Sequence, residues 1–367
     1  MENLLYKIAL TLLPGVGDVN AKKLVAHCGG VEAIFHEKRS NLLLIEGMGE
    51  KTVNAIKSAD VMKEAEEEVR FVEENQIQVD FYLDKSYPRR LLHCNDGPIL
   101  LYSKGEINWN AEKVISIVGT RMPTRNGQYI CEKLVADLKA FNVTIVSGLA
   151  YGIDITAHKA ALKHRIPTIG IMASGIQNVY PRTHVKTAEQ MQENGGIATD
   201  YRSDSAVLPI NFAERNRIVA GLADAVVVVE SAKKGGSLIT ADLANGYNRD
   251  VFAVPGRIDD SQSMGCNKLI KSHKAALIES AQDIAYVLSW EKPSQQKAKA
   301  NIQKQLFIEL SDDERKLLSA FADEKQLAID EISVKSGFPI SKTSSLLLQI
   351  EFMGLVRSLP GKVYEIV

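Results

Sequence analysis

The sequence is poor in cysteine, has no long apolar run and carries almost no net charge. Its four cysteines, Cys28, Cys94, Cys131 and Cys266, share no short spacing, so we expect neither a zinc site nor a disulfide framework. The longest uninterrupted apolar run covers residues 225–229, far fewer than the ~20 residues of a membrane span. The 44 basic and 45 acidic residues give a net charge of −1. This balance argues against a polycation of the histone kind but permits a local basic groove.

Common enzyme motifs and export signals are also missing. The chain contains no Walker-type G-x-x-x-x-G-K-[ST] loop, no G-x-G-x-x-G after the first parallel strand and no H-E-x-x-H zinc motif. The N-terminus has an acid at position 2 and no basic segment, so it does not resemble a signal peptide. We therefore expect a cytoplasmic protein without membrane association, metal or cofactor.

The 367 residues correspond to two or three domains at ~150 residues each. Residues 1–65 are predicted to form a helical domain of the helix-hairpin-helix or SAM-like kind, because a Gly-x-Gly turn at residues 15–17 recurs at residues 47–49. Each turn precedes a helical pattern whose free N–H groups suit a phosphate. The nearby cations are Lys22, Lys23 and Lys51. A plain docking domain is the alternative, since residues 1–60 hold seven basic and seven acidic residues.

Residues 66–290 are predicted to form an α/β domain with a Rossmann-like, mostly parallel sheet. Apolar strand patterns alternate there with helical patterns. The expected strands are residues 79–83, 99–102, 114–118, 143–147, 168–172, 196–199, 225–230 and 251–254. Because most of these strands are apolar throughout, helices should cover both faces of the sheet, as is typical of parallel α/β folds.

The C-terminal region is predicted to be a linker followed by a winged helix. Residues 291–305 are polar and lack aromatic side chains. Within residues 306–367, helical patterns at 311–322, 329–336 and 341–354 precede two strand patterns, at 356–359 and 363–366. This domain has seven basic and ten acidic residues, so we expect a protein-contact or regulatory role. The alternative is a weak duplex binder that uses Lys335, Lys342, Arg357 and Lys362.

Loops that follow the predicted parallel strands carry small residues beside cations. Ligands of an open parallel sheet bind beyond the carboxyl ends of its strands, where small residues let backbone N–H groups approach an anion and arginines supply positive charge. These loops contribute Gly119, Thr120, Arg121, Arg125, Ser147, Gly148, Arg182, Lys233, Lys234, Gly235, Gly236 and Ser237. Any one of these loops is explained by an ordinary strand–helix turn, but together they predict a polyanion site.

Residues 211–221 give a second indication of nucleic-acid binding. Arg215, Asn216 and Arg217 are suited to phosphate contacts, and Phe212 offers a face on which a base can stack. The alternative is the start of a surface helix whose arginines pair with Glu214 or Asp224.

Groupings typical of catalysis are sparse. Asp154 and His158 lie four residues apart and share a helix face, with Ser147 close in sequence. However, there is no G-x-S-x-G nucleophile turn, and Asp154 is more simply explained as a residue that caps or orients its helix. We expect no catalytic residues.

The ordered series of these segments resembles the bacterial DNA-processing protein A (DprA/Smf) family. The matching stretches are residues 119–121, 147–154, 180–181, 215–221, 235–241, 255–256 and 265–270. The match is strong over about residues 66–290, and the order of the flanking domains agrees with it.

The resemblance implies a non-enzymatic protein of natural transformation. It would bind and protect incoming single-stranded DNA, help to load the RecA recombinase and dimerise through its Rossmann domain. The resemblance further implies that Arg121 is the strongest DNA contact, that Arg182 occupies a basic position and that Arg215 and Arg217 belong to the binding stretch. Phe212 as a stacking residue is our own assignment.

A second hypothesis comes from a different functional class. Related Rossmann proteins with a Gly-Gly-rich loop act on nucleoside phosphates, and the required acid would be Glu230 or Asp242. Neither residue has a convincing basic partner in the sequence.

Overall fold

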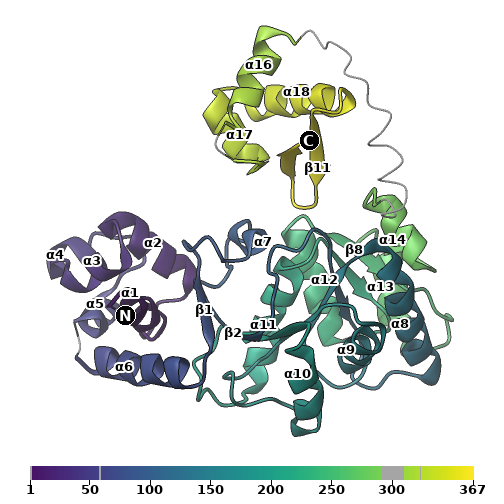
Figure 1. Cartoon of the computed structure of the whole chain (residues 1–367), viewed down its shortest axis with the longest axis horizontal. Coiled ribbons are helices and arrows are strands. Elements are labelled where there is room, and N and C mark those ends of the chain that lie inside the picture. Colours follow the sequence, from purple (N-terminus) through teal and green to yellow (C-terminus); the bar gives the residue numbers. More distant parts are fainter. Residues whose placement is uncertain (1, 58, 291–309, 323) are drawn as a thin grey trace.

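The computed structural model describes residues 2–57, 59–290, 310–322 and 324–367. Figure 1 shows a helical N-terminal region, a central sheet flanked by helices and a small C-terminal unit. The predicted linker, residues 291–305, lies outside the described residues. Within the described part of the chain, no helix combines the length and hydrophobicity that a bilayer crossing requires.

Six helices form the N-terminal region. They are α1 (Glu2–Thr11), α2 (Asp18–Cys28), α3 (Val31–His36), α4 (Arg39–Leu42), α5 (Glu50–Ile56) and α6 (Ala59–Glu74). Their apolar positions turn inward, and Ile8, Leu24, Leu42 and Val53 are fully buried. Helix α6 is amphipathic: Ala65 and Val72 lie in the same core, while Glu66 and Glu67 are exposed.

The two glycine turns of this region have the same geometry. Gly15 and Gly47 have φ values of +76° and +88°, a backbone conformation that favours glycine. A Cβ on Gly15 would lie 3.5 Å from the side chain of Thr52 in α5, and one on Gly47 would lie 3.2 Å from Asn20 in α2. Each turn therefore packs against the helix that follows the other turn, so the sequence repeat is also a structural repeat.

The central sheet is mixed and mostly parallel, in agreement with the sequence. Its order is β1-β2-β6-β5-β4-β3-β7-β8-β9. The strands are β1 (Gln78–Phe81), β2 (Leu100–Gly105), β3 (Val114–Val118), β4 (Thr144–Ser147), β5 (Thr168–Ile171), β6 (Gly195–Thr199), β7 (Ala225–Val228), β8 (Asp250–Ala253) and β9 (Ala276–Leu277). The first two pairings, β1 with β2 and β2 with β6, are antiparallel, and the others are parallel.

Helices cover both faces of this sheet. One face packs α8 (Arg125–Leu138), α9 (Ile153–His164) and α14 (Ala281–Val287). The other packs α11 (Pro209–Gly221), α12 (Gly236–Gly246) and α13 (Met264–Lys271). Shorter elements complete the domain: α7 (Arg89–Leu92), η1 (Lys139–Phe141), η2 (Arg182–His184) and α10 (Val185–Met191). This coverage explains why the parallel strands are apolar on both sides.

The C-terminal unit has the elements expected of a winged helix. They are α16 (Asp312–Ser319), β10 (Gln326–Ala328), α17 (Ile329–Ser336), α18 (Ile340–Phe352), β11 (Val356–Leu359) and β12 (Val363–Ile366). The sequence reading missed β10, which pairs with β12 to give a three-stranded sheet. The wing turn contacts the central domain, because the Gly361 N–H donates to the Asn248 carbonyl at 3.1 Å and Arg249 donates to the Pro360 carbonyl at 3.0 Å (Figure 1).

Candidate nucleic-acid interface

The chain reverses its direction of travel across the sheet at β3. From β3 the strands advance through β4 and β5 to β6, and the chain then returns to place β7 on the other side of β3. In open α/β sheets, such a switch point leaves a crevice beyond the carboxyl ends of the strands. We use the name crevice for the surface at this edge of the sheet, which the loops that follow β3, β4, β5 and β7 form together with the start of α11.

The first of these loops, residues 119–124, is held by Glu230. The Thr120 N–H donates to the Glu230 carbonyl at 2.7 Å. The Glu230 carboxylate accepts from the Thr124 N–H at 2.9 Å and from the Thr124 hydroxyl at 2.6 Å. Thr124 in turn caps α8 by accepting from the Gly127 N–H at 3.0 Å. These bonds fix the loop, which leaves the Arg121 side chain exposed to solvent.

The loop after β4 presses directly against the first loop. Gly152 has φ +83°, and a Cβ on it would lie 2.2 Å from the Thr120 carbonyl oxygen. The Ile153 N–H donates to the same oxygen at 3.2 Å. Only glycine permits this approach, so Gly152 sets the position of Tyr151 relative to Arg121.

A cation and two aromatic rings meet at the mouth of the crevice. The Arg121 guanidinium lies 4.9 Å from the centroid of the Phe212 ring. The Tyr180 ring packs against Phe212 at 5.8 Å and 65°, edge to face. Tyr180 is 46% exposed and Phe212 is partly exposed. We call these three residues the Arg121 stack; its rings and planar cation are suited to unstacked bases.

Further cations at this edge are exposed and have no acidic partner. Among the ion pairs of the described residues, none involves the four exposed residues Arg125, Arg182, Lys233 and Lys234. By contrast, Arg90 pairs with Asp224 at 2.7 Å, on the far side of the domain from the crevice. Unpaired cations create the positive potential that attracts a polyanion.

Arg215 supports the floor of the crevice instead of projecting from it. Its side chain is 3% exposed, and its guanidinium donates to the carbonyls of Gly148 and Ile171. Burial lowers the pKa of Arg215 to about 10, although Asp154 opposes this shift. Burial likewise raises the pKa of the Asp154 carboxyl, against the attraction of Arg215. Arg215 thus remains a buried cation that orders the loop after β4.

Arg217 joins the sheet to the N-terminal helical region. It forms ion pairs with Asp200 and, at 3.0 Å, with Asp18, the first residue of α2. Asp18 also accepts from the Ile99 N–H at 2.8 Å. The start of α2 is therefore occupied by a carboxylate that docks on the central domain, which favours the docking interpretation of the first glycine turn. The alternative interpretation, in which these arginines pair with Glu214 or Asp224, does not describe the structure, because Arg217 pairs with Asp200 and Asp18 and Arg215 donates to backbone carbonyls.

The remaining predicted site residues differ in how far their side chains are buried and in what they contact. Ser147 is fully buried and donates to the Ile117 carbonyl at 2.6 Å, and Ser237 is buried and donates to Ser231 at 2.9 Å. Asn216 accepts from Arg215 at 3.3 Å. Three glycines serve close packing, because a Cβ would lie 2.5 Å from a neighbouring side-chain atom: Gly119, Gly148 and Gly235. Gly236, at the start of α12, has open space around it. Tyr151 and Tyr180 lie in two of the stretches that resemble the family, but they were not among the predicted site residues, although both are aromatic residues in loops at this edge.

The side chains considered for catalysis form hydrogen bonds or ion pairs with other residues of the protein. His158 is fully buried, and its Nδ1 lies 2.7 Å from the Thr168 hydroxyl. Burial, with His184 and Arg215 nearby, lowers its pKa to about 3. Both Glu230 oxygens are bound to Thr124, and Asp242 pairs with Lys274 at 2.7 Å. Neither acid of the nucleotide-processing hypothesis is therefore free to act on a substrate in the crevice.

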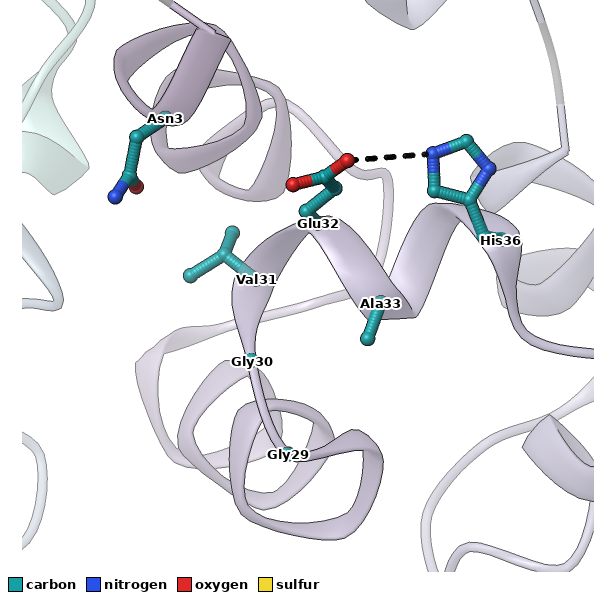
Figure 2. A pocket seen from close by; sticks show the side chains of 7 residues that line it. All are labelled: Asn3, Gly29, Gly30, Val31, Glu32, Ala33 and His36. Carbon is teal, nitrogen blue, oxygen red and sulfur yellow. Dashed lines mark ion pairs between the residues drawn. The ribbon is translucent and has the colours of Figure 1, made fainter.

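A separate cavity lies in the N-terminal region (Figure 2). It has a volume of about 470 Å³ and lies beside the loop between α2 and α3. The titratable side chains that line it, Glu32 and His36, face one another at 3.9 Å. This cavity offers no unpaired cation to a nucleic acid. Within the described ranges, no group of three or more potential ligands is arranged for a metal ion.

Two family models match this chain, one over the α/β domain and one over the winged helix. Residues 78–289 match the family described as DNA recombination-mediator protein A, and residues 304–362 match the DprA winged helix domain. Protein Smf of Synechocystis is 31% identical over 98% of this chain and 98% of its own length. DNA processing protein DprA of Bacillus subtilis is 39% identical over 54% of this chain and 67% of its own length.

Two solved structures share the fold. DNA processing protein A from Streptococcus pneumoniae superposes with a TM-score of 0.65 at 28% identity, covering 78% of this chain and 98% of its own. The Helicobacter pylori protein, whose structure concerns its single-stranded DNA binding mode, superposes with a TM-score of 0.53 at 28% identity, covering 59% and 98%.

The fold defines an α/β protein with a mostly parallel sheet, a helical N-terminal region and a winged helix. The chain belongs to the DprA/Smf family of DNA recombination-mediator proteins.

Proposed function

We propose that this protein binds single-stranded DNA in the crevice, without sequence preference and without chemically altering it. The observation that carries the proposal is the Arg121 stack, an exposed guanidinium over an aromatic ring beside four unpaired cations. Phosphate attraction combined with base stacking is how proteins hold single strands irrespective of sequence. The single-stranded DNA binding mode of the Helicobacter pylori relative supports the same ligand class.

In this proposal the bound strand is delivered to the RecA recombinase during natural transformation and is protected until then. The family description as a recombination mediator supports this role. The contacts we assign to DNA are those of the exposed residues Arg121, Arg125, Arg182, Phe212, Lys233, Lys234 and Gly236. The buried Arg215, Ser147 and Ser237, together with Gly119, Gly148 and Gly235, shape the crevice, as do Thr120 and Asn216. Arg217 holds the domains together.

We also propose a homodimer through the Rossmann-like domain. Two apolar side chains that follow β8 in the chain are well exposed: Ile258 at 94% and Leu277 at 49%. Strand β9, which holds Leu277, is the last strand of the sheet. A second copy that covers these side chains removes them from water. Sedimentation equilibrium of the wild type and of Ile258→Asp tests this, and a monomeric wild type contradicts it.

The direct test of DNA binding is the Arg121→Ala variant. Losing a charge-assisted contact should weaken oligo(dT) binding by about 1.5–3 kcal/mol. Fluorescence anisotropy gives the affinity, and thermal unfolding should show an unchanged Tm because the side chain is exposed. Mononucleotides should not compete at concentrations that saturate a nucleotide-processing enzyme. Unaltered oligo(dT) binding by a folded Arg121→Ala protein would show that the crevice is not the site.

A further inference from the structure

A groove opens beside the crevice and shares Arg121 with it. It has a volume of about 660 Å³ and lies between the first loop and α8 on one side and Tyr151 and α9 on the other. We call it the α8–α9 groove. The residues that matter for its chemistry are Arg121, Met122, Tyr151, Ile155, Lys159 and Glu132. The crevice contacts assigned above do not use this groove, apart from Arg121.

The lining combines apolar surface with unpaired positive charge. Met122 is 77% exposed and Tyr151 is 46% exposed, so water-accessible apolar area is available to a flat ring. Lys159, one turn of α9 beyond Ile155, is exposed and forms no ion pair among the described residues. An aromatic face next to a free cation matches a nucleotide, which presents a base and a phosphate a few ångströms apart.

The α8 wall of the groove is polar and carries one carboxylate. Gln128 and Glu132 line it, and both lie on α8. Amide and carboxylate groups accept hydrogen bonds from the exocyclic amines of bases, whereas a carboxylate repels phosphate. The charge distribution therefore directs the phosphates of a strand toward Arg121 and Lys159 and leaves the α8 wall to base edges.

Tyr151 is held in place before any ligand arrives. Its ring packs edge to face against His184, with ring centroids 5.1 Å apart. The buried His184 bonds through Nδ1 to the Leu149 carbonyl at 2.9 Å. The contact of Gly152 with Thr120 fixes the backbone next to Tyr151. A ring that is already ordered loses little entropy when a base stacks on it.

We propose that single-stranded DNA leaving the Arg121 stack continues through the α8–α9 groove, where one base packs on Tyr151 and Met122 and the next phosphate contacts Lys159. This inference rests on the proposed function, because it extends the same strand. It commits to one ligand, the sugar–phosphate chain of single-stranded DNA, and it gives the bound strand a direction across the domain, from α11 toward α9.

The test uses the full chain and oligo(dT) of about 16 nucleotides, the upper range for one single-strand binding fold. Tyr151→Leu keeps apolar bulk but removes the ring, and it should weaken binding about 5- to 150-fold, as loss of one stacked base does. Lys159→Ala should weaken binding and reduce the slope of log affinity against log salt by about one, the effect of one phosphate contact. Lys139→Ala is the matched control, since Lys139 is exposed at the opposite end of the α8 segment, and it should bind as the wild type does.

The outcomes separate this inference from the function on which it rests. If Arg121→Ala loses affinity while Tyr151→Leu and Lys159→Ala keep wild-type affinity and salt slope, the strand does not enter the groove and the inference is wrong. If Arg121→Ala also binds normally, the crevice itself is not the DNA site. If Lys139→Ala weakens binding as much as Lys159→Ala, the lysine effect is general surface charge and the groove is not a subsite. Lys159 is exposed, so its variant keeps the test decisive if Tyr151→Leu fails to fold.

Discussion

Arginines in and near the crevice differ in their surroundings. An exposed arginine is available to a ligand, whereas a buried one stabilises the fold. Arg121 is exposed over Phe212, whereas Arg215 is buried against two carbonyls and near Asp154. Positions two apart in a helix lie on different faces, so Arg215 and Arg217 point to different surroundings. The sequence suggested phosphate contacts for both because composition alone does not reveal which face of α11 is covered.

The buried arginine leads to a stability prediction. Arg215→Ala leaves the buried Gly148 and Ile171 carbonyls without their donor and removes the charge that attracts the Asp154 carboxyl, and each buried acceptor left unpaired costs about 1–3 kcal/mol. Thermal or urea unfolding should show this loss, while Arg121→Ala unfolds as the wild type does. An Arg215→Ala protein with wild-type stability and reduced DNA affinity would instead place Arg215 among the DNA contacts.

His158 gives the domain a pH dependence. Its folded pKa is about 3, against an ordinary value of 6.5, because burial disfavours the charged ring. The unfolded chain therefore takes up a proton below about pH 6.5 that the folded chain cannot accept until about pH 3. The stability contributed by neutral His158 is complete above pH 6.5 and falls as the pH is lowered, by about 2 kcal/mol at pH 5.

Unfolding free energies measured between pH 7 and pH 5 check this expectation. The variant His158→Gln removes the titrating ring, so its stability should change less over this range than that of the wild type. If the two proteins show the same pH dependence, other groups are responsible and His158 is not held neutral by burial.

At the scale of elements, long apolar strands and helices with clear boundaries were predictable from the sequence. β3 at 114–118 and α17 at 329–336 agree with the sequence reading to the residue, because continuous apolar runs and the closing Gly337 are local signals. β9 has two residues and β10 has three, too few to show an alternating pattern. The contacts of Gly152 with Thr120, and of Glu230 with Thr124, join segments distant in sequence and were not predictable from either segment alone.

In the winged helix, too, the sequence motif does not reveal which contacts the side chains make. Three cations that a duplex binder would use are already paired with acids: Lys335 with Glu324 at 2.8 Å, Lys342 with Asp313 at 2.7 Å and Arg357 with Glu365 at 2.5 Å. The exposed side of α18 also carries apolar residues, Leu348 at 53% and Phe352 at 84%. These features favour the protein-contact role expected from the net charge of this domain.

Charge reversal in the winged helix tests that role. The double variant Lys342→Glu and Arg357→Glu should leave oligo(dT) affinity within about threefold of the wild type, because non-specific affinity depends on phosphate contacts that these residues do not make. Anisotropy with single-stranded and duplex DNA measures it. A large loss on either DNA, with the Tm unchanged, would make the winged helix a DNA-binding element and contradict the charge argument.

At the scale of the whole molecule, the chain is nearly neutral, yet the edge beyond the carboxyl ends of its parallel strands carries exposed cations that form no ion pair among the described residues: Arg121, Arg125, Arg182, Lys233 and Lys234. Paired arginines elsewhere, such as Arg90 and Arg217, hold the architecture together. The N-terminal region docks through Asp18, and the wing turn docks on Arg249. The Arg121 stack stays exposed at the sheet edge, and aromatic faces beside cations are typical of proteins that hold single strands.

The most direct test of this account is an equilibrium titration of the full chain with single-stranded and duplex DNA of equal length at several salt concentrations. The account predicts tighter binding of the single strand, with log affinity falling linearly as log salt rises, because bound phosphates release counterions. It further predicts little difference between oligonucleotides of different sequence. Equal affinity for both DNA forms, with no dependence on salt, would contradict it.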